Sequence, residues 1–175
     1  MTVAKFIPVA VVVGILAALW VLVGSAFNLI LWVPFLSWAL FFGAGAGKFS
    51  RVPKEIIGLT GGTVAAVVLL LLLPLSTGIF GPTWALPVLV FLAALIIVML
   101  ELTNLFELAP AYFYSFAGFF AYFFGGFGGK ELALPMVLNF WILLLVGTAL
   151  GIFTGFLRKI IFDIEKVPPE QRQTI

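Results

Sequence analysis

The chain has 175 residues, of which 64% are hydrophobic and 9% are charged, and its mean hydropathy is +1.30. A soluble domain carries roughly a quarter charged residues, so this composition excludes a protein that covers itself with a water-compatible surface. The formal charge of +2 comes from nine basic residues that stand at the ends of apolar segments. This placement is typical of membrane topology rather than of nucleic-acid binding.

The missing residue types exclude several kinds of chemistry. The sequence contains no cysteine and no histidine, which excludes disulfides, thiolate metal sites and the usual proton shuttle at neutral pH. The glycine-rich run GAGAGK at 43–48 does not match the phosphate-binding pattern GxxxxGK[ST] and follows an apolar segment rather than a strand. We therefore expect no enzyme, no cofactor and no metal site.

Six apolar segments follow one another along the chain, and each approaches the 20 or so residues that a membrane-spanning helix requires. We read the first as a retained span rather than a cleaved signal peptide, because its apolar run is long and more spans follow. The stretch PLSTGIFGPT is expected to be a turn-rich, uncharged loop between the third and fourth spans. A single transmembrane domain is expected at 1–162 and a polar cytoplasmic tail at 163–175. The predicted spans are 6–27, 29–47, 55–75, 84–102, 106–127 and 132–157.

The basic residues predict the orientation of these spans. With a cytoplasmic N-terminus, the inner side collects eight basic residues and the outer side keeps only Lys130. Because lysine and arginine near the spans accumulate on the cytoplasmic side, both termini are expected to be cytoplasmic. The eight are Lys5, Lys48, Arg51, Lys54, Arg158, Lys159, Lys166 and Arg172.

Small residues at every fourth position indicate an internal duplication, since they allow close helix packing in lipid. The second and fifth spans match at an offset of 82 residues, and the third and sixth at an offset of 89. Repeat A would cover about 1–80 and repeat B about 83–162. Because each unit has three spans, the second would be inverted, as in many transporters. The alternative is that glycine and alanine are common in any membrane helix. The matched residues are Ala39, Gly43 and Gly47 with Ala121, Gly125 and Gly129, and Gly58, Gly62 and Ala66 with Gly147, Gly151 and Gly155.

A few side chains are candidates for a solute pathway. Glu101 follows a long apolar run, where a carboxylate is either an intramembrane functional group or an ordinary interfacial charge. Asn28, Asn104 and Asn139 either line a water-accessible path or hydrogen-bond between helices. Six aromatic residues form either a hydrophobic constriction or a packed interior, namely Trp38, Phe41, Phe42, Phe120, Phe123 and Phe124.

Three segments carry a resemblance to a known family: FLSWALFFGAGAGK, GLTGGTVAAVV, and the closing stretch PAYFYSFAGFFAYFFGG with LPMVLNFWILLLVGTALGIFTGFLRK. With these segments the chain resembles the YcdZ-type bacterial inner-membrane proteins, a small family classed as a domain of unknown function. The resemblance covers most of the length and implies a bacterial or archaeal inner-membrane location. It implies no activity and no site residues.

Together these features predict an all-α integral membrane protein with six transmembrane helices in two inverted three-helix repeats. The expected function is that of a channel or facilitator for a small neutral solute or a small weak acid, with its pathway at the repeat interface. A protomer this small has little surface to shield a pore, so a homo-oligomer in the lipid bilayer is expected. The alternative is a structural or accessory membrane subunit that transports nothing.

Overall fold

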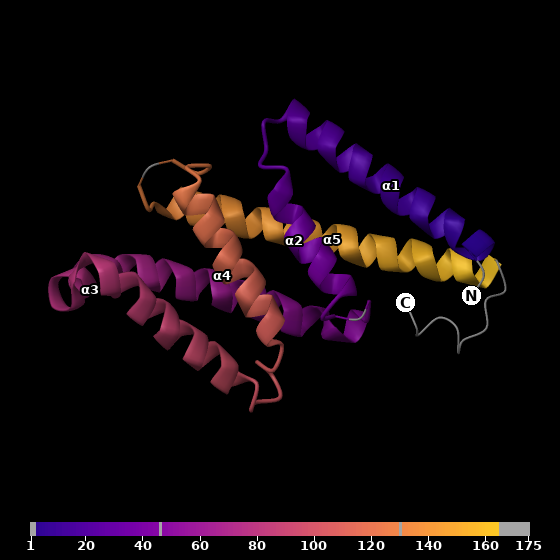
Figure 1. Cartoon of the computed structure of the whole chain (residues 1–175). Helices are drawn as coiled ribbons and strands as arrows, with labels where there is room; N and C mark the ends of the chain where they lie inside the picture. Colours follow the sequence, from indigo (N-terminus) through magenta and orange to yellow (C-terminus); the bar gives the residue numbers. More distant parts are fainter. Residues whose placement is uncertain (1–2, 46, 130, 165–175) are drawn as a thin grey trace.

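The computed structural model describes residues 3–45, 47–129 and 131–164 (Figure 1), and within them the chain is all helical, with no strand. Five α-helices and one short 3-10 helix follow each other, and the connections between them are turns of a few residues. The helices are α1 (Val3–Ala26), α2 (Trp32–Phe42), η1 (Phe49–Arg51), α3 (Val52–Leu100), α4 (Ala109–Phe124) and α5 (Leu134–Ile164).

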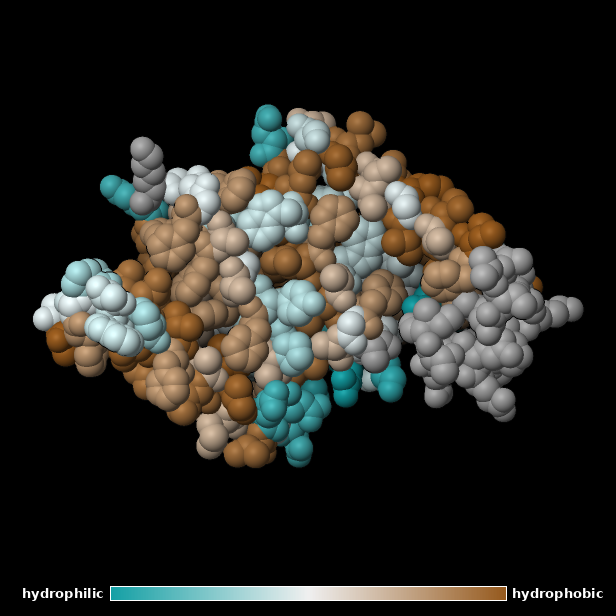
Figure 2. Space-filling model, in the orientation of Figure 1, coloured by the Kyte–Doolittle hydropathy of each residue, from teal (hydrophilic) through white to brown (hydrophobic). Residues whose placement is uncertain are grey.

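Three of the helices are long and apolar enough to cross a membrane, and they lie within 6–26, 49–100 and 134–164. Hydrophobic residues cover most of the visible surface, whereas hydrophilic residues gather in patches near the turns, most clearly below the end of α3 (Figure 2). Such a surface is matched to lipid rather than to water. The chain is therefore a membrane protein by length and composition of its helices.

α3 folds back on itself at Gly81. This residue has φ 76° and ψ 165°, a conformation that only glycine adopts easily, and Pro82 follows it as the first residue of a new helical segment. The two segments, 52–80 and 82–100, lie side by side in Figure 1. The start of the first segment is linked to the turn that follows the second segment, because Lys54 Nζ donates a 2.6 Å hydrogen bond to Glu107 Oε1.

Several predicted boundaries were wrong. The stretch 74–83 is not a loop, because the helix continues through Pro74 and breaks only at Gly81. The second and fifth spans are shorter than expected: α2 has 11 residues and α4 has 16, which gives lengths of about 16 Å and about 24 Å. α5 extends to Ile164, into the predicted polar tail, of which 165–175 lies outside the described residues.

The two short helices each cross a long one. α4 packs on α3, and α2 packs on α5, while α1 lies along the far part of α5 (Figure 1). The largest cluster of buried residues fills the space where α2, α3, α4 and α5 meet. Leu59, Phe119, Phe140 and Leu144 are fully buried there, so the centre of the molecule is filled with side chains.

Glycines permit both crossings. A Cβ added at Gly147 of α5 would overlap the carbonyl oxygen of Pro34 and Oγ of Ser37 in α2. In the same way, a Cβ added at Gly62 of α3 would overlap the carbonyl oxygen of Tyr112 and Oγ of Ser115 in α4. Each serine also donates a hydrogen bond across its crossing.

The contacts across the two crossings do not pair residues at the predicted offsets of 82 and 89, so the predicted repeat is not supported in that register. Ser37 and Ser115, which are 78 residues apart, lie against Gly147 and Gly62, which are 85 residues apart. The carbonyl oxygens that accept their hydrogen bonds, those of Leu144 and Gly58, are 86 residues apart. The offsets of 78 and 85 lie four residues, one helical turn, below the predicted 82 and 89. The difference of seven residues between the two offsets is unchanged, because both offsets are smaller by the same four residues.

The other predicted packing positions have different surroundings. Gly58 faces Ala111 and Tyr112, while Gly151 and Gly155 face Phe41. Ala39 is exposed and Ala66 is buried. Gly43, Gly47, Gly125 and Gly129 lie in the turns after α2 and α4 rather than within helices, and Gly47 and Gly129 have positive φ angles.

Candidate functional site

The most unusual polar group of the described residues is the carboxylate of Glu55. Glu55 lies in the first turn of α3 and has no exposed surface. Neither of its side-chain oxygens has a hydrogen-bond partner. A buried charged group without a partner is costly, so such a group is satisfied by a proton, by an ordered water or by a ligand.

The turn between α2 and α3 encloses this carboxylate. A Cβ added at Gly45 would overlap Glu55 Oε1 and would lie 2.6 Å from the carbonyl oxygen of Phe41, so only glycine permits the approach. The turn is closed by backbone hydrogen bonds from Gly47 N to Phe41 O at 2.8 Å and from Lys48 N to Gly45 O at 3.1 Å. Gly45 and the hydrogen-bonded turn around it therefore cover Glu55 closely.

Basic residues surround the turn without pairing to the carboxylate. Arg51 lies four residues before Glu55, and its guanidinium donates a 2.8 Å hydrogen bond to the carbonyl oxygen of Ala44. Lys54 is bound to Glu107 in the turn after α3. This hydrogen bond and the positive charge of Lys54 lower the pKa of Glu107 below its ordinary value. Glu55 thus lies in an electropositive region whose cations are directed elsewhere.

The chemistry that Glu55 offers is that of a single buried carboxylate. Within the described residues, no group of three or more acidic, cysteine or histidine side chains is placed to hold a metal ion. A lone carboxylate can accept hydrogen bonds from a solute that carries N–H or O–H groups, or it can hold a proton.

The polar residues predicted to line a solute pathway lie in different parts of the structure. Glu101 and Asn104 are exposed in the turn 101–108, and Asn28 is exposed in the turn after α1, where its φ is 53°. Asn139 lies in the second turn of α5 and donates a 3.2 Å hydrogen bond to Tyr122 Oη. These four residues do not share one cavity, and their role in a pathway stays a prediction.

The six aromatic residues separate into two groups. Trp38 and Phe41 of α2 are buried, and Phe41 packs edge-on against Phe42 with ring centroids 5.1 Å apart. In α4, Phe124 contacts both Phe120 and Phe123. Among the described ring contacts, none joins the α2 group to the α4 group. A shared constriction therefore stays a prediction.

The sequence contained a signal for Glu55, but this residue was predicted only as the first of the third span, 55–75, and was not singled out. Glu55 stands directly before a long apolar run that begins at Ile56, just as Glu101 stands directly after one. What distinguishes the two glutamates is the glycine turn that folds over Glu55, which is a tertiary contact. Tyr112, a second buried group with an unpartnered oxygen, was not singled out at all.

Comparison with known proteins identifies a family but no activity. A family model described as a protein of unknown function (DUF1097) matches residues 10–161, which include most of all five helices. No curated protein and no solved structure matches the chain.

Proposed function

The chain belongs to the DUF1097 family, whose function is unknown, and we propose that it facilitates the passage of a small solute across a bacterial or archaeal inner membrane. In this proposal it is a YcdZ-type protein in which each segment of α3 counts as one crossing. With α1 and α5 this gives four helices long enough to cross, whereas α2 and α4, about 16 Å and about 24 Å long, are shorter than the hydrocarbon core. The first segment of α3 is about 43 Å long and can cross the hydrocarbon core of about 30 Å at a tilt. The second is about 28 Å long, which is near the lower limit for a membrane-spanning helix.

The observation that carries the proposal is the reciprocal packing of two halves, α1 to Phe80 and Pro82 to α5. The middle helix of each half packs on the last helix of the other through the same elements: a serine, a glycine and a carbonyl. The pattern Leu-x-x-Gly-Thr recurs at 59–63 and 144–148, and Thr63 and Thr148 are both buried and both bind the carbonyl four residues earlier. These matches support an inverted duplication.

Inverted repeats are characteristic of transporters that alternate between two conformations around a site at the repeat interface. The interface here is packed with side chains between α2, α3, α4 and α5, so passage requires the halves to move. This favours a gated facilitator or carrier over a permanently open channel. The contact of Lys54 with Glu107 supports the predicted topology, because it brings two turns on the same proposed cytoplasmic side together.

Glu55 supplies the chemistry in this proposal. Its unpartnered oxygens lie beneath the glycine turn at the cytoplasmic end of α3, where a solute with N–H or O–H donors would bind. Urea, acetamide, glycerol and protonated acetic acid have such donors and no net charge. The rest of the described interior offers apolar surface and hydroxyl groups, which suits small neutral molecules.

Solute flux into proteoliposomes that contain only this protein tests the proposal. Stopped-flow light scattering would be recorded with urea, acetamide, glycerol and acetate in turn. We expect faster swelling with at least one solute, and a reduction of about tenfold for Glu55→Gln, because a hydrogen bond to a charged group is worth about 1.5 kcal/mol or more. Glu131→Gln is the matched control, since Glu131 is exposed in the turn before α5.

Two results would count against the proposal. If folded protein in the bilayer accelerates none of the four solutes, the chain acts as a structural or accessory subunit instead. If flux is observed but Glu55→Gln and Glu131→Gln both retain it, transport stands and Glu55 is not part of the pathway. The two failures are distinguishable because the first is seen in the unaltered protein.

A further inference from the structure

The surroundings of Glu55 restrict the form in which its side chain can be buried. Its two carboxylate oxygens have neither accessible surface nor a hydrogen-bond partner. An ionised carboxylate in such a place loses its hydration without compensation, whereas the neutral acid loses much less. The turn after α2 therefore covers the neutral acid at a far smaller cost than the ionised carboxylate.

The close approach of Gly45 limits what can satisfy this side chain. A Cβ added at Gly45 would overlap Glu55 Oε1, so the space between them is too small for a water molecule. The same Cβ would lie 2.6 Å from the carbonyl oxygen of Phe41, which places two acceptor oxygens beside one small space. A proton on the carboxylate resolves this conflict, because a carboxylic acid donates a hydrogen bond. The Phe41 carbonyl accepts one hydrogen bond, from Gly47 N at 2.8 Å, and keeps a second lone pair.

A proton fits this place better than a metal ion does. Hard cations take about six or more oxygen ligands, and no group of three or more acidic side chains in the described ranges is placed to supply them. A metal ion would also have to enter a space from which Gly45 already excludes a Cβ.

The basic residues next to Glu55 in the chain are bound to other groups. Arg51 donates a hydrogen bond to the Ala44 carbonyl oxygen, and Lys54 is paired with Glu107. The positive charge of Arg51 favours an ionised carboxylate, whereas burial favours the neutral acid. This balance changes when the turn moves away, because an uncovered carboxylate regains its hydration.

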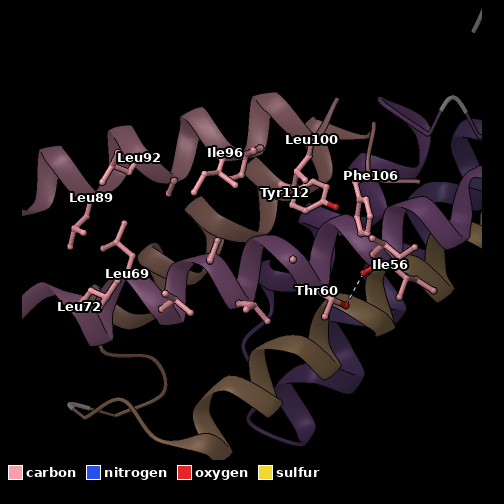
Figure 3. A pocket seen from close by; sticks show the side chains of 17 residues that line it. Ile56, Thr60, Leu69, Leu72, Leu89, Leu92, Ile96, Leu100, Phe106 and Tyr112 are labelled. Carbon is pink, nitrogen blue, oxygen red and sulfur yellow. Dashed lines mark hydrogen bonds between the residues drawn. The ribbon is translucent and has the colours of Figure 1, made fainter. Parts of the chain in front are cut away.

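The helices that pack against α3 bring few titratable groups to this site. α2 and α4 contain no charged residue. Tyr112 of α4 lies with Leu100 and Phe106 in an apolar groove between the two segments of α3 (Figure 3), and it is not hydrogen-bonded to Glu55. Glu55 is the acidic side chain that contacts the turn after α2. The other charged residues on the elements around it are Lys48 before η1 and, in α5, Arg158, Lys159 and Asp163.

The cover over Glu55 is a short turn rather than a helix. It is closed by backbone hydrogen bonds and by the contact of Arg51 with the Ala44 carbonyl oxygen. Gly47 in this turn has a φ of 63°, a conformation that glycine adopts without strain. Loss of a proton from Glu55 would leave an unsolvated charge beneath the turn, and movement of the turn would admit water to it. The acid thus stabilises the covered form, and the carboxylate stabilises the open form.

We propose that Glu55 holds a proton while the turn covers it, and that release of this proton to water opens the solute site, so that solute passage rises with pH. Because this switch acts on the solute site, it rests on the proposed function. Glu55→Gln keeps a neutral side chain of nearly the same shape, so it should keep the covered form at every pH. Since one proton is exchanged, the ratio of open to covered protein changes at most about tenfold per pH unit.

Two measurements that need no solute test the switch in lipid bilayers between about pH 5 and about pH 9. The first is the infrared C=O stretching band of protonated carboxylic acids in the unaltered protein, Glu55→Gln and the exposed control Glu131→Gln. The second is the rate at which a maleimide labels Ala44→Cys, whose thiol is unique because the sequence contains no cysteine. Asn104→Cys, at an exposed position, corrects for the pH dependence of the thiol itself.

We expect a carboxylic-acid component that disappears as the pH rises, is missing from Glu55→Gln and is kept in Glu131→Gln. The corrected labelling rate of Ala44→Cys should rise about tenfold or more over the same range, and it should stay constant when Glu55→Gln is combined with it. For a solute that passes, flux through the unaltered protein should rise with pH, and flux through Glu55→Gln should stay low.

The possible failures are distinguishable. If the unaltered protein and Glu55→Gln have the same carboxylic-acid band at every pH, Glu55 does not hold the proton and the proposal is overturned. If the corrected labelling of Ala44→Cys has the same pH dependence with and without Glu55→Gln, the proton does not control the turn, which also overturns it. If both measurements give the expected result but no solute passes, the switch at Glu55 is supported and the proposed transport is refuted.

Discussion

Gly147→Ala tests the crossing of α2 and α5 most directly. The new Cβ would overlap the Pro34 carbonyl oxygen and Ser37 Oγ and would lie 2.7 Å from the Pro34 carbonyl carbon. Because Pro34 belongs to the body of α2, no side-chain rotation relieves the overlap. The two helices must separate, and this stretches the 2.6 Å hydrogen bond from Ser37 Oγ to the carbonyl oxygen of Leu144.

The expected cost follows from three contributions. Overpacking of this kind destabilises by about 1–3 kcal/mol, and a weakened hydrogen bond adds up to about 1 kcal/mol. Alanine regains about 0.8–1 kcal/mol through its higher helix propensity. The net loss is therefore about 2 kcal/mol in the free energy of unfolding.

The assay is a reversible titration of SDS into mixed micelles, followed by circular dichroism. Gly78→Ala is the matched control, because Gly78 is also helical and an added Cβ there meets nothing within 4 Å. We expect this control to be neutral or to gain up to about 1 kcal/mol. If Gly147→Ala lies within about 0.5 kcal/mol of Gly78→Ala, the close approach of α2 and α5 is refuted.

Two further predictions concern single polar contacts. Ser37→Ala should lower the free energy of unfolding by about 1 kcal/mol. Ser115→Ala should lower it by less, because the hydrogen bond from Ser115 to the Gly58 carbonyl oxygen is 3.4 Å long. Equal losses for the two variants in the same SDS titration would contradict this order. Because the hydrogen bond and the charge of Lys54 lower the pKa of Glu107 in the folded chain, the contribution is fully present above the ordinary pKa of a glutamate and is lost as the pH falls through the lowered, folded-state pKa. Glu107→Gln should therefore be less stable than the unaltered protein at pH 7, and the difference should shrink as the pH is lowered; a difference that does not change with pH would exclude the Lys54 contact as its cause.

The membrane class and most helix positions were predictable from the sequence, because they depend on runs of apolar residues. The turn at Gly81 was predicted as a loop over the whole stretch 74–83, because three prolines and two glycines between residues 74 and 87 are typical of a loop. Prolines are tolerated within a membrane helix, where neighbouring groups satisfy the freed backbone. Only the positive φ angle of Gly81 shows which residue turns the chain.

The register of the proposed duplication could be predicted only to within one helical turn. Small residues repeat every four positions in all four segments, so a displacement by four produces nearly as good a match. The pattern F-x-S-aromatic-A-x-F-F at 35–42 and 113–120 was present in the sequence and supports the offset of 78. The predicted offset of 82 was based on the spacing of small residues, although Ser37 and Ser115, which precede them, are the more specific residues.

The proposed equivalence of the two halves allows Glu55 to be compared with its counterpart in the second half. At the offset of 85, the counterpart of Glu55 is Phe140, which is fully buried and packs against Phe119 and Tyr122 with ring centroids 5.2 Å and 5.3 Å away. One half thus fills this position with a ring that stabilises the interior, whereas the other half places a carboxylate there without a partner. Since an apolar side chain solves the packing problem, stability does not require the charge. The difference therefore points to a ligand or a proton at Glu55 rather than to a structural role.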